Sequence, residues 1–188
     1  MPVRSYTNIK MFGQCPAKYK AMTVDKSVPF TTTQQQQDGI DAHAALEAYI
    51  TTRTPLPARF SSYQDVVEAI VRFKGEKVCE KKLAIDTDVN PVDYWDKSVW
   101  YRGIIDVLVI NGDKARILDY KRGNKAHQDD DQLLENAILV FSNYPEVDTI
   151  TASFIYLEAG DVTKLVVRRE DLHMAGRGYV QGECRLSA

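Results

Sequence analysis

The sequence predicts an α/β fold in which a mixed central β-sheet is flanked by helices. Segments with helical periodicity alternate along the chain with apolar, β-branched segments, in the order α, α, β, β, β, α, β, β, α. In the middle of the chain, within residues 102–123, Asn111-Gly112 separates two strand-like segments, and both residues tolerate the positive φ of a tight hairpin turn. The 188 residues suit one domain, with a helical part at 1–75 and a sheet-bearing core at 76–188.

The composition is ordinary for a globular protein, with 44% hydrophobic and 27% charged residues. No apolar run approaches the roughly 20 residues that span a bilayer, and residues 1–10 lack the apolar stretch of a secretory signal. Cys15, Cys79 and Cys184 are scattered and odd in number, which favours a reducing compartment over a disulfide framework. We therefore expect a cytoplasmic protein without membrane contact. The net charge of −2 excludes a global attraction to nucleic acid, so any surface that binds it must be local.

The N-terminal part is expected to be helical. Ser5 is placed to cap a short helix, and residues 38–53 are rich in Ala, Leu and Glu. Within the second segment, helical spacing defines an inward stripe of Ile40, His43, Leu46 and Ile50. A single histidine on such a stripe is more often a core residue than a ligand. A further amphipathic helix begins at Ser61 or Ser62 and ends near Gly75.

The core begins with a strand at 76–86, which is followed by a polar connection at 86–100 and the central hairpin. In this hairpin Asp106 interrupts an apolar run, and Asp119 and Lys121 share one face of the returning strand because side chains alternate. Asp106 falls opposite or nearly opposite residues 117–119, and the turn length leaves the register open. Charges are rarely tolerated in apolar strands unless they are paired or bind a metal. For an isolated Asp-x-Lys pattern, a salt bridge on a solvated face is the more frequent outcome.

After the hairpin, residues 128–143 predict a helix with an apolar inward face. Residues 147–158 and 162–168 predict a second hairpin around Gly160, and a last helix begins at Arg169.

The central motif resembles that of a known enzyme superfamily. Gly103-x-x-Asp106, followed after the hairpin by Asp119-Tyr120-Lys121, resembles the core motif of PD-(D/E)XK nucleases. It is most similar to the RecB-like branch, which includes the CRISPR-associated RecB-like nucleases and phage exonucleases. The upstream run Gly39-x-x-x-His43-x-x-Leu46-Glu47 is similar to another signature of this branch. The resemblance implies a restriction-endonuclease-like core and a single nuclease domain spanning 1–188.

The resemblance also implies a metal centre. It makes His43, Asp106, Asp119 and the backbone carbonyl of Tyr120 ligands of Mg²⁺ or Mn²⁺, a donor set that suits these cations. It gives Lys121 a catalytic role, which is to orient or deprotonate water or to stabilise charge on the phosphate. Glu80 matches a catalytic glutamate that opens the core in this branch, although an exposed strand residue fits the sequence equally well. Glu47 is interpreted as structural.

DNA contacts are expected around the motif. Gln132 matches the glutamine of the branch's Q-x-x-x-Y motif, which binds the DNA backbone, but the tyrosine position holds Asn136. The basic residues Arg102, Arg122 and Lys125 are further candidates for DNA binding. Some branch members hold an iron–sulfur cluster with four cysteines. This chain has three cysteines, so no cluster is expected and Cys15 is interpreted as a small buried residue.

Together these features predict a metal-dependent deoxyribonuclease, an exonuclease in recombination, repair or phage DNA processing. Its partners would be single- or double-stranded DNA ends and a recombination or single-strand-binding protein, in the host cytoplasm if the gene is carried by a phage. Three alternatives stay open: an RNA-cleaving endonuclease, a non-catalytic nucleic-acid-binding module, and a CRISPR-associated spacer-processing nuclease.

Overall fold

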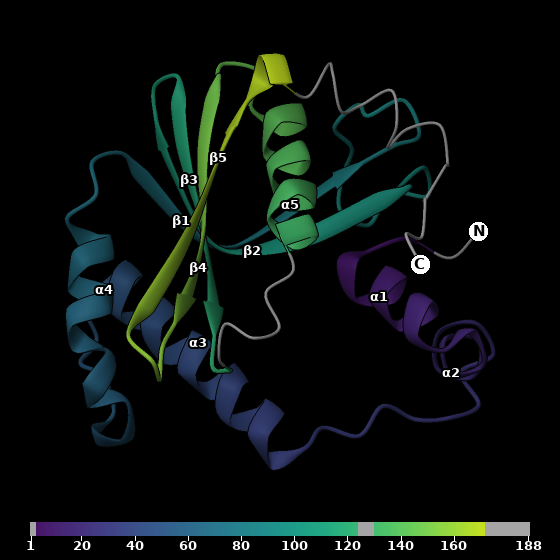
Figure 1. The fold of residues 1–188 in the computed structure, drawn as a ribbon, viewed down its shortest axis with the longest axis horizontal. Coiled ribbons are helices and arrows are strands. Elements are labelled where there is room, and N and C mark those ends of the chain that lie inside the picture. Colours follow the sequence, from purple (N-terminus) through teal and green to yellow (C-terminus); the bar gives the residue numbers. More distant parts are fainter. Residues whose placement is uncertain (1–2, 124–129, 172–188) are drawn as a thin grey trace.

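The computed structural model describes residues 3–123 and 130–171, and its centre is a five-stranded mixed sheet (Figure 1). The strand order is β1-β2-β3-β4-β5; β3 and β4 are parallel and every other neighbouring pair is antiparallel. The strands are β1 (Glu76–Ile85), β2 (Tyr101–Asn111), β3 (Lys114–Lys121), β4 (Thr149–Tyr156) and β5 (Asp161–Arg168). The predicted α/β fold with a mixed sheet flanked by helices is confirmed.

The α-helices of the described residues are α1 (Tyr6–Gln14), α2 (Pro16–Tyr19), α3 (Gln34–Thr52), α4 (Gln64–Val71) and α5 (Asp130–Asn143). Ser5 caps α1 as predicted. Helix α3 begins earlier than predicted because Thr33 and Gln36 form a capping box, in which each side chain bonds the backbone N–H of the other residue. Ser61 and Ser62 lie in a 3₁₀ turn (Ala58–Tyr63) and do not cap α4. Among the described residues, none of the helices combines the length and apolarity needed to cross a membrane.

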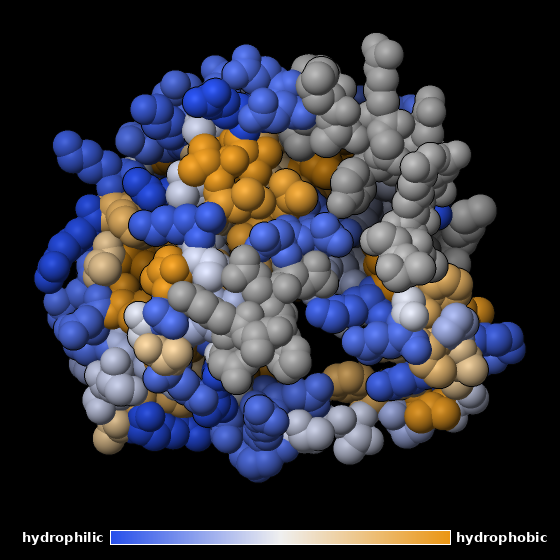
Figure 2. All heavy atoms as spheres, viewed as in Figure 1, coloured by the Kyte–Doolittle hydropathy of each residue, from blue (hydrophilic) through white to orange (hydrophobic). Residues whose placement is uncertain are grey.

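The two faces of the sheet are covered by different helices. Helix α5 packs on one face through residues such as Leu133 and Val140, and α3 and α4 pack on the other through Leu46 and Val67. In the same view as Figure 1, apolar side chains form a patch beside α5 within a mainly hydrophilic surface (Figure 2). The prediction that Ile40 faces inward is wrong: Ile40 is 57% exposed, because the buried stripe of α3 runs through Ala42, Leu46 and Ile50.

Strands β1 and β2 both switch faces at the same level. In β1, Cys79 packs against the α3/α4 cluster whereas Leu83 belongs to the α5 cluster, although two residues four apart share a face in a regular strand. In β2, Val107 faces α3/α4 and Ile105 faces α5. Register is kept on both sides of the switch, where Cys79 pairs with Val107 and Lys81 with Ile105.

The residues at the switch are Glu80 and Asp106. Glu80 has a φ of +48°, a left-handed conformation that costs a non-glycine residue roughly 1–2 kcal/mol. The pairing of β2 with β3 ends one step away, at Val107 and Leu118, whereas β3 stays paired with β4 as far as Lys121. Beyond this point β2 diverges from β3 (Figure 1), and a fork opens between the two strands.

Gly103 lets α5 approach the diverging half of β2. A Cβ atom at this position would lie 2.8 Å from Cδ1 of Leu139 and 3.3 Å from Oδ1 of Asn136. Both neighbours are buried, so a side chain at position 103 would have to displace packed side chains of α5. Packing against α5 therefore favours the glycine of the sequence motif.

Gly75, between α4 and β1, provides a test of this architecture. Its φ is +114°, and an added Cβ would lie 2.2 Å from the carbonyl oxygen of Ile110. We expect Gly75→Ala to lower the free energy of unfolding in urea by roughly 2–4 kcal/mol, through backbone strain and overpacking. Gly112→Ala is the matched control: its φ is +61° with open space around it, so the loss should be about 1–2 kcal/mol. Equal losses would contradict the close approach at Gly75.

Candidate active site

Three potential metal ligands converge at the fork from three elements. His43 comes from α3, Glu80 from β1 and Asp106 from β2, and one donor atom of each lies within 4.8 Å of the others. Nδ1 of His43 is 3.6 Å from Oδ1 of Asp106 and 4.0 Å from Oε1 of Glu80. The exposed fraction of the side chain is 40% for Glu80 but 14% for Asp106, so the cluster opens to solvent on the Glu80 side. One imidazole nitrogen with carboxylate oxygens is a donor set that Mn²⁺ and Mg²⁺ accept.

Asp106 also replaces a missing strand partner. Its Oδ2 accepts a hydrogen bond of 2.8 Å from the backbone N–H of Tyr120, at the level where β2 no longer pairs with β3. This bond holds the carboxylate across the fork and leaves Oδ1 facing His43. Val107 pairs with Leu118, so Asp106 is level with Asp119, which confirms the expectation that Asp106 falls opposite or nearly opposite residues 117–119.

Asp119, Lys121 and Gln132 form a second group beside the cluster. The Gln132 side chain donates to Oδ1 of Asp119 at 2.7 Å and accepts from Nζ of Lys121 at 2.8 Å. Nζ of Lys121 also forms an ion pair with Oδ2 of Asp119 at 2.6 Å, and this ion pair lowers the pKa of the Asp119 carboxyl against the effect of burial. Gln132, on α5, therefore fixes the relative positions of the motif carboxylate and the motif lysine.

The electrostatics of the site show a shortage of positive charge. Burial raises the pKa of Asp106 well above its ordinary range, and the neighbouring Asp119 carboxylate raises it further. Burial raises the pKa of Asp119 too, although the ion pair with Lys121 opposes this. The pKa of Glu80 is raised by burial and by Glu47, with Lys82 close enough to act against the rise. Carboxylates in such surroundings are stabilised by a bound cation.

His43 is held in the form that binds metals. Burial lowers the pKa of its imidazole, which favours the neutral ring. A backbone hydrogen bond with Tyr120 acts in the opposite direction, and the two rings are in edge contact at 5.3 Å between centroids. The neutral imidazole and the clustered carboxylates of Glu80 and Asp106 fit a divalent cation at the fork.

The other predicted site residues lie in different surroundings. Arg122 turns to acidic neighbours, with Nη2 2.8 Å from Glu158 and Nη1 3.8 Å from Asp38. Arg102 stacks on aromatic rings of the loop before β2 and precedes Asp106 by four residues on the same strand. Lys125 and Cys184 are outside the described residues. Cys15 is exposed, so its interpretation as a buried residue is wrong; its Sγ accepts the N–H of Lys18 at the start of α2.

Sequence reasoning named Glu80 as a catalytic residue but did not place it among the metal ligands. The signal that would have placed it there is the β1–β2 register, which sets Glu80 level with Asp106, and no pattern in β1 alone reveals that register. The bonds from Gln132 to Asp119 and Lys121 were likewise not predicted, because they depend on how α5 packs across the sheet.

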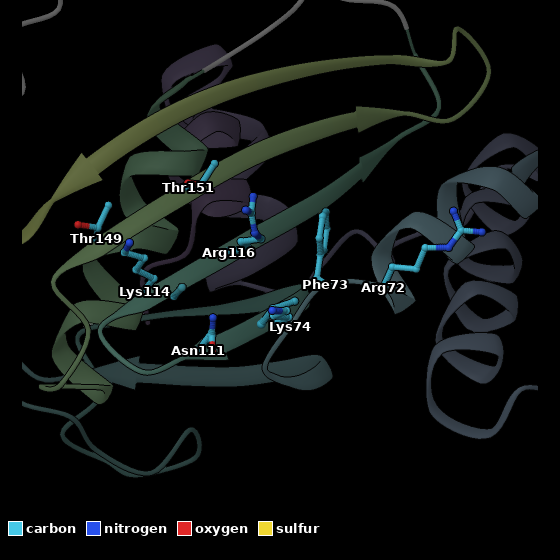
Figure 3. Close-up of a pocket in the computed structure, with 10 residues that line it drawn as sticks. Arg72, Phe73, Lys74, Asn111, Lys114, Arg116, Thr149 and Thr151 are labelled. Carbon is cyan, nitrogen blue, oxygen red and sulfur yellow. The ribbon is translucent and has the colours of Figure 1, made fainter.

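A separate hollow of about 320 Å³ lies at the other end of the sheet (Figure 3). It is bounded by the end of α4 and the first residues of β3 and β4, and its lining includes Arg72, Lys74, Lys114 and Arg116. None of the predicted site residues lines it. The candidate chemistry is therefore at the fork and not in this hollow.

Comparisons with known proteins show the fold. No protein-family model matches the chain, and a search of curated proteins finds no match either. The chain is similar to the crystal structure of a protein of Eubacterium rectale that is provisionally named an exonuclease, with a TM-score of 0.52 and 12% identity over 96% of this chain and 78% of the other. The structure of SSO0001 is more distant, with a TM-score of 0.41 and 7% identity over 97% and 77% of the two chains. The first likeness supports the mixed α/β fold.

Because the clustered carboxylates lack compensating positive charge, we expect replacement of one of the proposed metal-binding carboxylates to stabilise the metal-free protein. Burial holds the folded-state pKa of Asp106 above its ordinary 3.8, so the folded chain binds this proton more tightly than the unfolded chain. Stability from this group is therefore lost as the pH rises from about 4 through the raised pKa. At pH 7 in EDTA we expect Asp106→Asn to raise the free energy of unfolding by roughly 1 kcal/mol or more, since one pKa unit corresponds to about 1.36 kcal/mol.

Urea unfolding with and without Mn²⁺ checks this prediction. Asp148→Asn, at a carboxylate whose side chain is 70% exposed, is the control and should change little. With Mn²⁺ the order should reverse, because only the wild-type protein keeps the full ligand set. A less stable Asp106→Asn protein in EDTA would contradict the charge shortage.

Proposed function

We propose that this chain is a metal-dependent nuclease of the PD-(D/E)XK type that hydrolyses phosphodiester bonds of DNA. The observation that carries the proposal is the meeting of His43, Glu80 and Asp106 at the fork, beside a lysine that Asp119 and Gln132 hold in place. The RecB-like motif resemblance in the sequence supports it independently. A solvated salt bridge does not account for a histidine and carboxylates drawn together from three elements.

The metal would be held by His43, Glu80 and Asp106, with Oδ2 of Asp119 and the carbonyl of Tyr120 as further oxygen donors. When bound, Mg²⁺ or Mn²⁺ polarises the scissile phosphate and lowers the pKa of a coordinated water. The protein's contribution is to keep these donors in place before substrate arrives. The Tyr120 N–H fixes Asp106, and burial keeps His43 neutral.

Lys121 has the position of an electrostatic stabiliser. Its ammonium forms an ion pair with Asp119 and donates a hydrogen bond to Oε1 of Gln132. The side chain is 34% exposed, so the ammonium can still reach a substrate oxygen at the mouth of the fork. We assign it the stabilisation of negative charge that develops on the phosphate. Gln132 is then a positioning residue, which acts on the reaction through Asp119 and Lys121.

DNA and cleavage from an end are the substrate and mode we favour. The RecB-like resemblance supports DNA, and the provisional exonuclease name of the similar Eubacterium rectale protein supports processing from an end. Trimming of DNA ends in recombination, repair or phage DNA processing is the role that follows, with a recombination or single-strand-binding protein as the fitting partner.

Cleavage of end-labelled linear DNA and RNA, beside covalently closed circles, tests the proposal. We expect linear DNA to be shortened with Mn²⁺ or Mg²⁺, not with EDTA, and not by the Asp119→Ala protein. Circles should survive. Metal-dependent cleavage of circles would establish an endonuclease. Cleavage confined to RNA would show that the substrate is RNA and not DNA. Binding without cleavage under all conditions would favour the non-catalytic module.

Lys121→Met separates the lysine's role from metal binding. We expect a loss of at least about 100-fold in cleavage rate, the usual cost of removing one preorganised transition-state contact. The affinity for Mn²⁺, measured by isothermal titration calorimetry, should be kept because Lys121 offers no ligand atom. Lys114→Met, at the exposed beginning of the same strand, is the matched control and should cleave normally. An active Lys121→Met protein would remove Lys121 from the mechanism.

A further inference from the structure

Trp95 is 73% exposed although the loop that carries it is firmly held. Residues 86–100 join β1 to β2 without regular secondary structure, and their own side chains fix the backbone. Asp86 accepts the backbone N–H groups of Asp88 and Asn90, both at 2.9 Å, and Asp96 accepts that of Ser98 at 2.7 Å. The loop therefore presents a large aromatic side chain to solvent at a defined position.

Two cations lie over the aromatic rings of this loop. The guanidinium carbon of Arg102 is 4.7 Å from the ring centroids of both Tyr94 and Trp95, and Nη1 of Arg102 donates to the carbonyl of Tyr94 at 3.2 Å. Nζ of Lys82 is 5.8 Å from both centroids. The two rings meet edge to face at 4.9 Å. We call these four residues, Lys82, Tyr94, Trp95 and Arg102, the loop platform.

The loop platform adjoins the candidate metal centre along the β1–β2 hairpin. Lys82 is two residues beyond Glu80, roughly 7 Å along a strand, and its partner in β2 is Ile104, two residues before Asp106. Neighbouring Leu83 faces α5, so Lys82 faces the opposite side of the sheet, the side on which α3 carries His43. Ile104, between the platform and the centre, is 41% exposed, so this part of the hairpin surface is open as far as the described residues show.

We propose that the loop platform binds a single nucleic-acid strand through its unpaired bases and phosphates, and leads it to the metal centre. That the bound strand is led to the metal centre rests on the proposed nuclease function. Trp95 keeps much of its surface free for a stacked base, and Lys82 and Arg102 supply charge for the phosphates. Stacking accepts any base but requires it to be unpaired, so a base within a duplex is excluded. Two carboxylates lie near these cations on the same loop. Asp96 accepts hydrogen bonds from the backbone N–H and the hydroxyl of Ser98, and Asp93 is exposed to solvent.

Binding in EDTA, where the metal-dependent reaction is stopped, tests the platform. The probes are fluorescein-labelled oligothymidylate, oligouridylate and a blunt DNA duplex, measured by anisotropy. We expect Trp95→Ala to weaken binding of the single strands by about 5- to 100-fold, the range for loss of one stacked base, and to leave duplex binding unchanged. Trp95→Phe should keep most of the affinity. Phe30→Ala, which removes another exposed aromatic ring, is the control and should have no effect.

Two further readouts separate stacking from charge. In a Trp100→Phe background, fluorescence of Trp95 should be quenched on addition of oligothymidylate. Lys82→Gln should reduce the slope of log affinity against log salt concentration by about 0.7, the value for one phosphate contact on a single strand. Unquenched fluorescence, or an equal loss of single-strand and duplex affinity in Trp95→Ala, would overturn the platform.

The outcomes distinguish this inference from the proposed function. Metal-dependent cleavage with unchanged single-strand binding in Trp95→Ala would remove the platform and leave the nuclease. Trp95-dependent binding of single strands by a protein that cleaves neither DNA nor RNA would keep the platform and remove the nuclease.

Discussion

The parting of β2 from β3 is the constraint on which the candidate site depends. While the two strands pair, helices on opposite faces of the sheet are separated by a continuous layer of backbone. Where pairing ends after Val107 and Leu118, His43 from α3 and Gln132 from α5 can both reach the same opening. The Asp106 carboxylate, which accepts the Tyr120 N–H, supplies the hydrogen bond that the departing strand no longer provides.

Backbone strain and clustered negative charge both occur where the two strands separate. Glu80 takes a left-handed backbone conformation where β1 and β2 exchange faces, and Asp106 lies level with it. The exchange directs two carboxylates towards His43, so that negative charges accumulate against Coulomb repulsion and desolvation. A fold selected for stability alone would avoid this combination. Its presence is explained if a cation occupies the cluster during function.

The order of helices and strands along the chain and the hairpin of β2 and β3 could be predicted from sequence because they depend on local patterns. Alternation of side chains placed Asp119 and Lys121 together, and the Asn111-Gly112 turn paired their strand with that of Asp106. The place of Glu80 could not be predicted, because its direction depends on a backbone irregularity shared by two strands. Ile40 was placed inward by periodicity alone, but the packing surface of α3 lies along Ala42 and Leu46. The ion pair of Arg122 with Glu158 was not predicted, because the two residues are 36 positions apart in the sequence.

The bend in the β1–β2 hairpin also determines how a substrate could approach. Among the described residues, no side chain of the two strands beyond Glu80 and Asp106 belongs to the α3/α4 cluster. Ile104 is exposed there, and the end of the hairpin bears the loop of residues 86–100. Within the described residues, the same face exchange that gathers the carboxylates therefore leaves Ile104 exposed beside them. A continuous β2–β3 pairing would remove the metal cluster and the approach together. The site and its access thus have one structural origin, although their residues lie on separate segments of the chain.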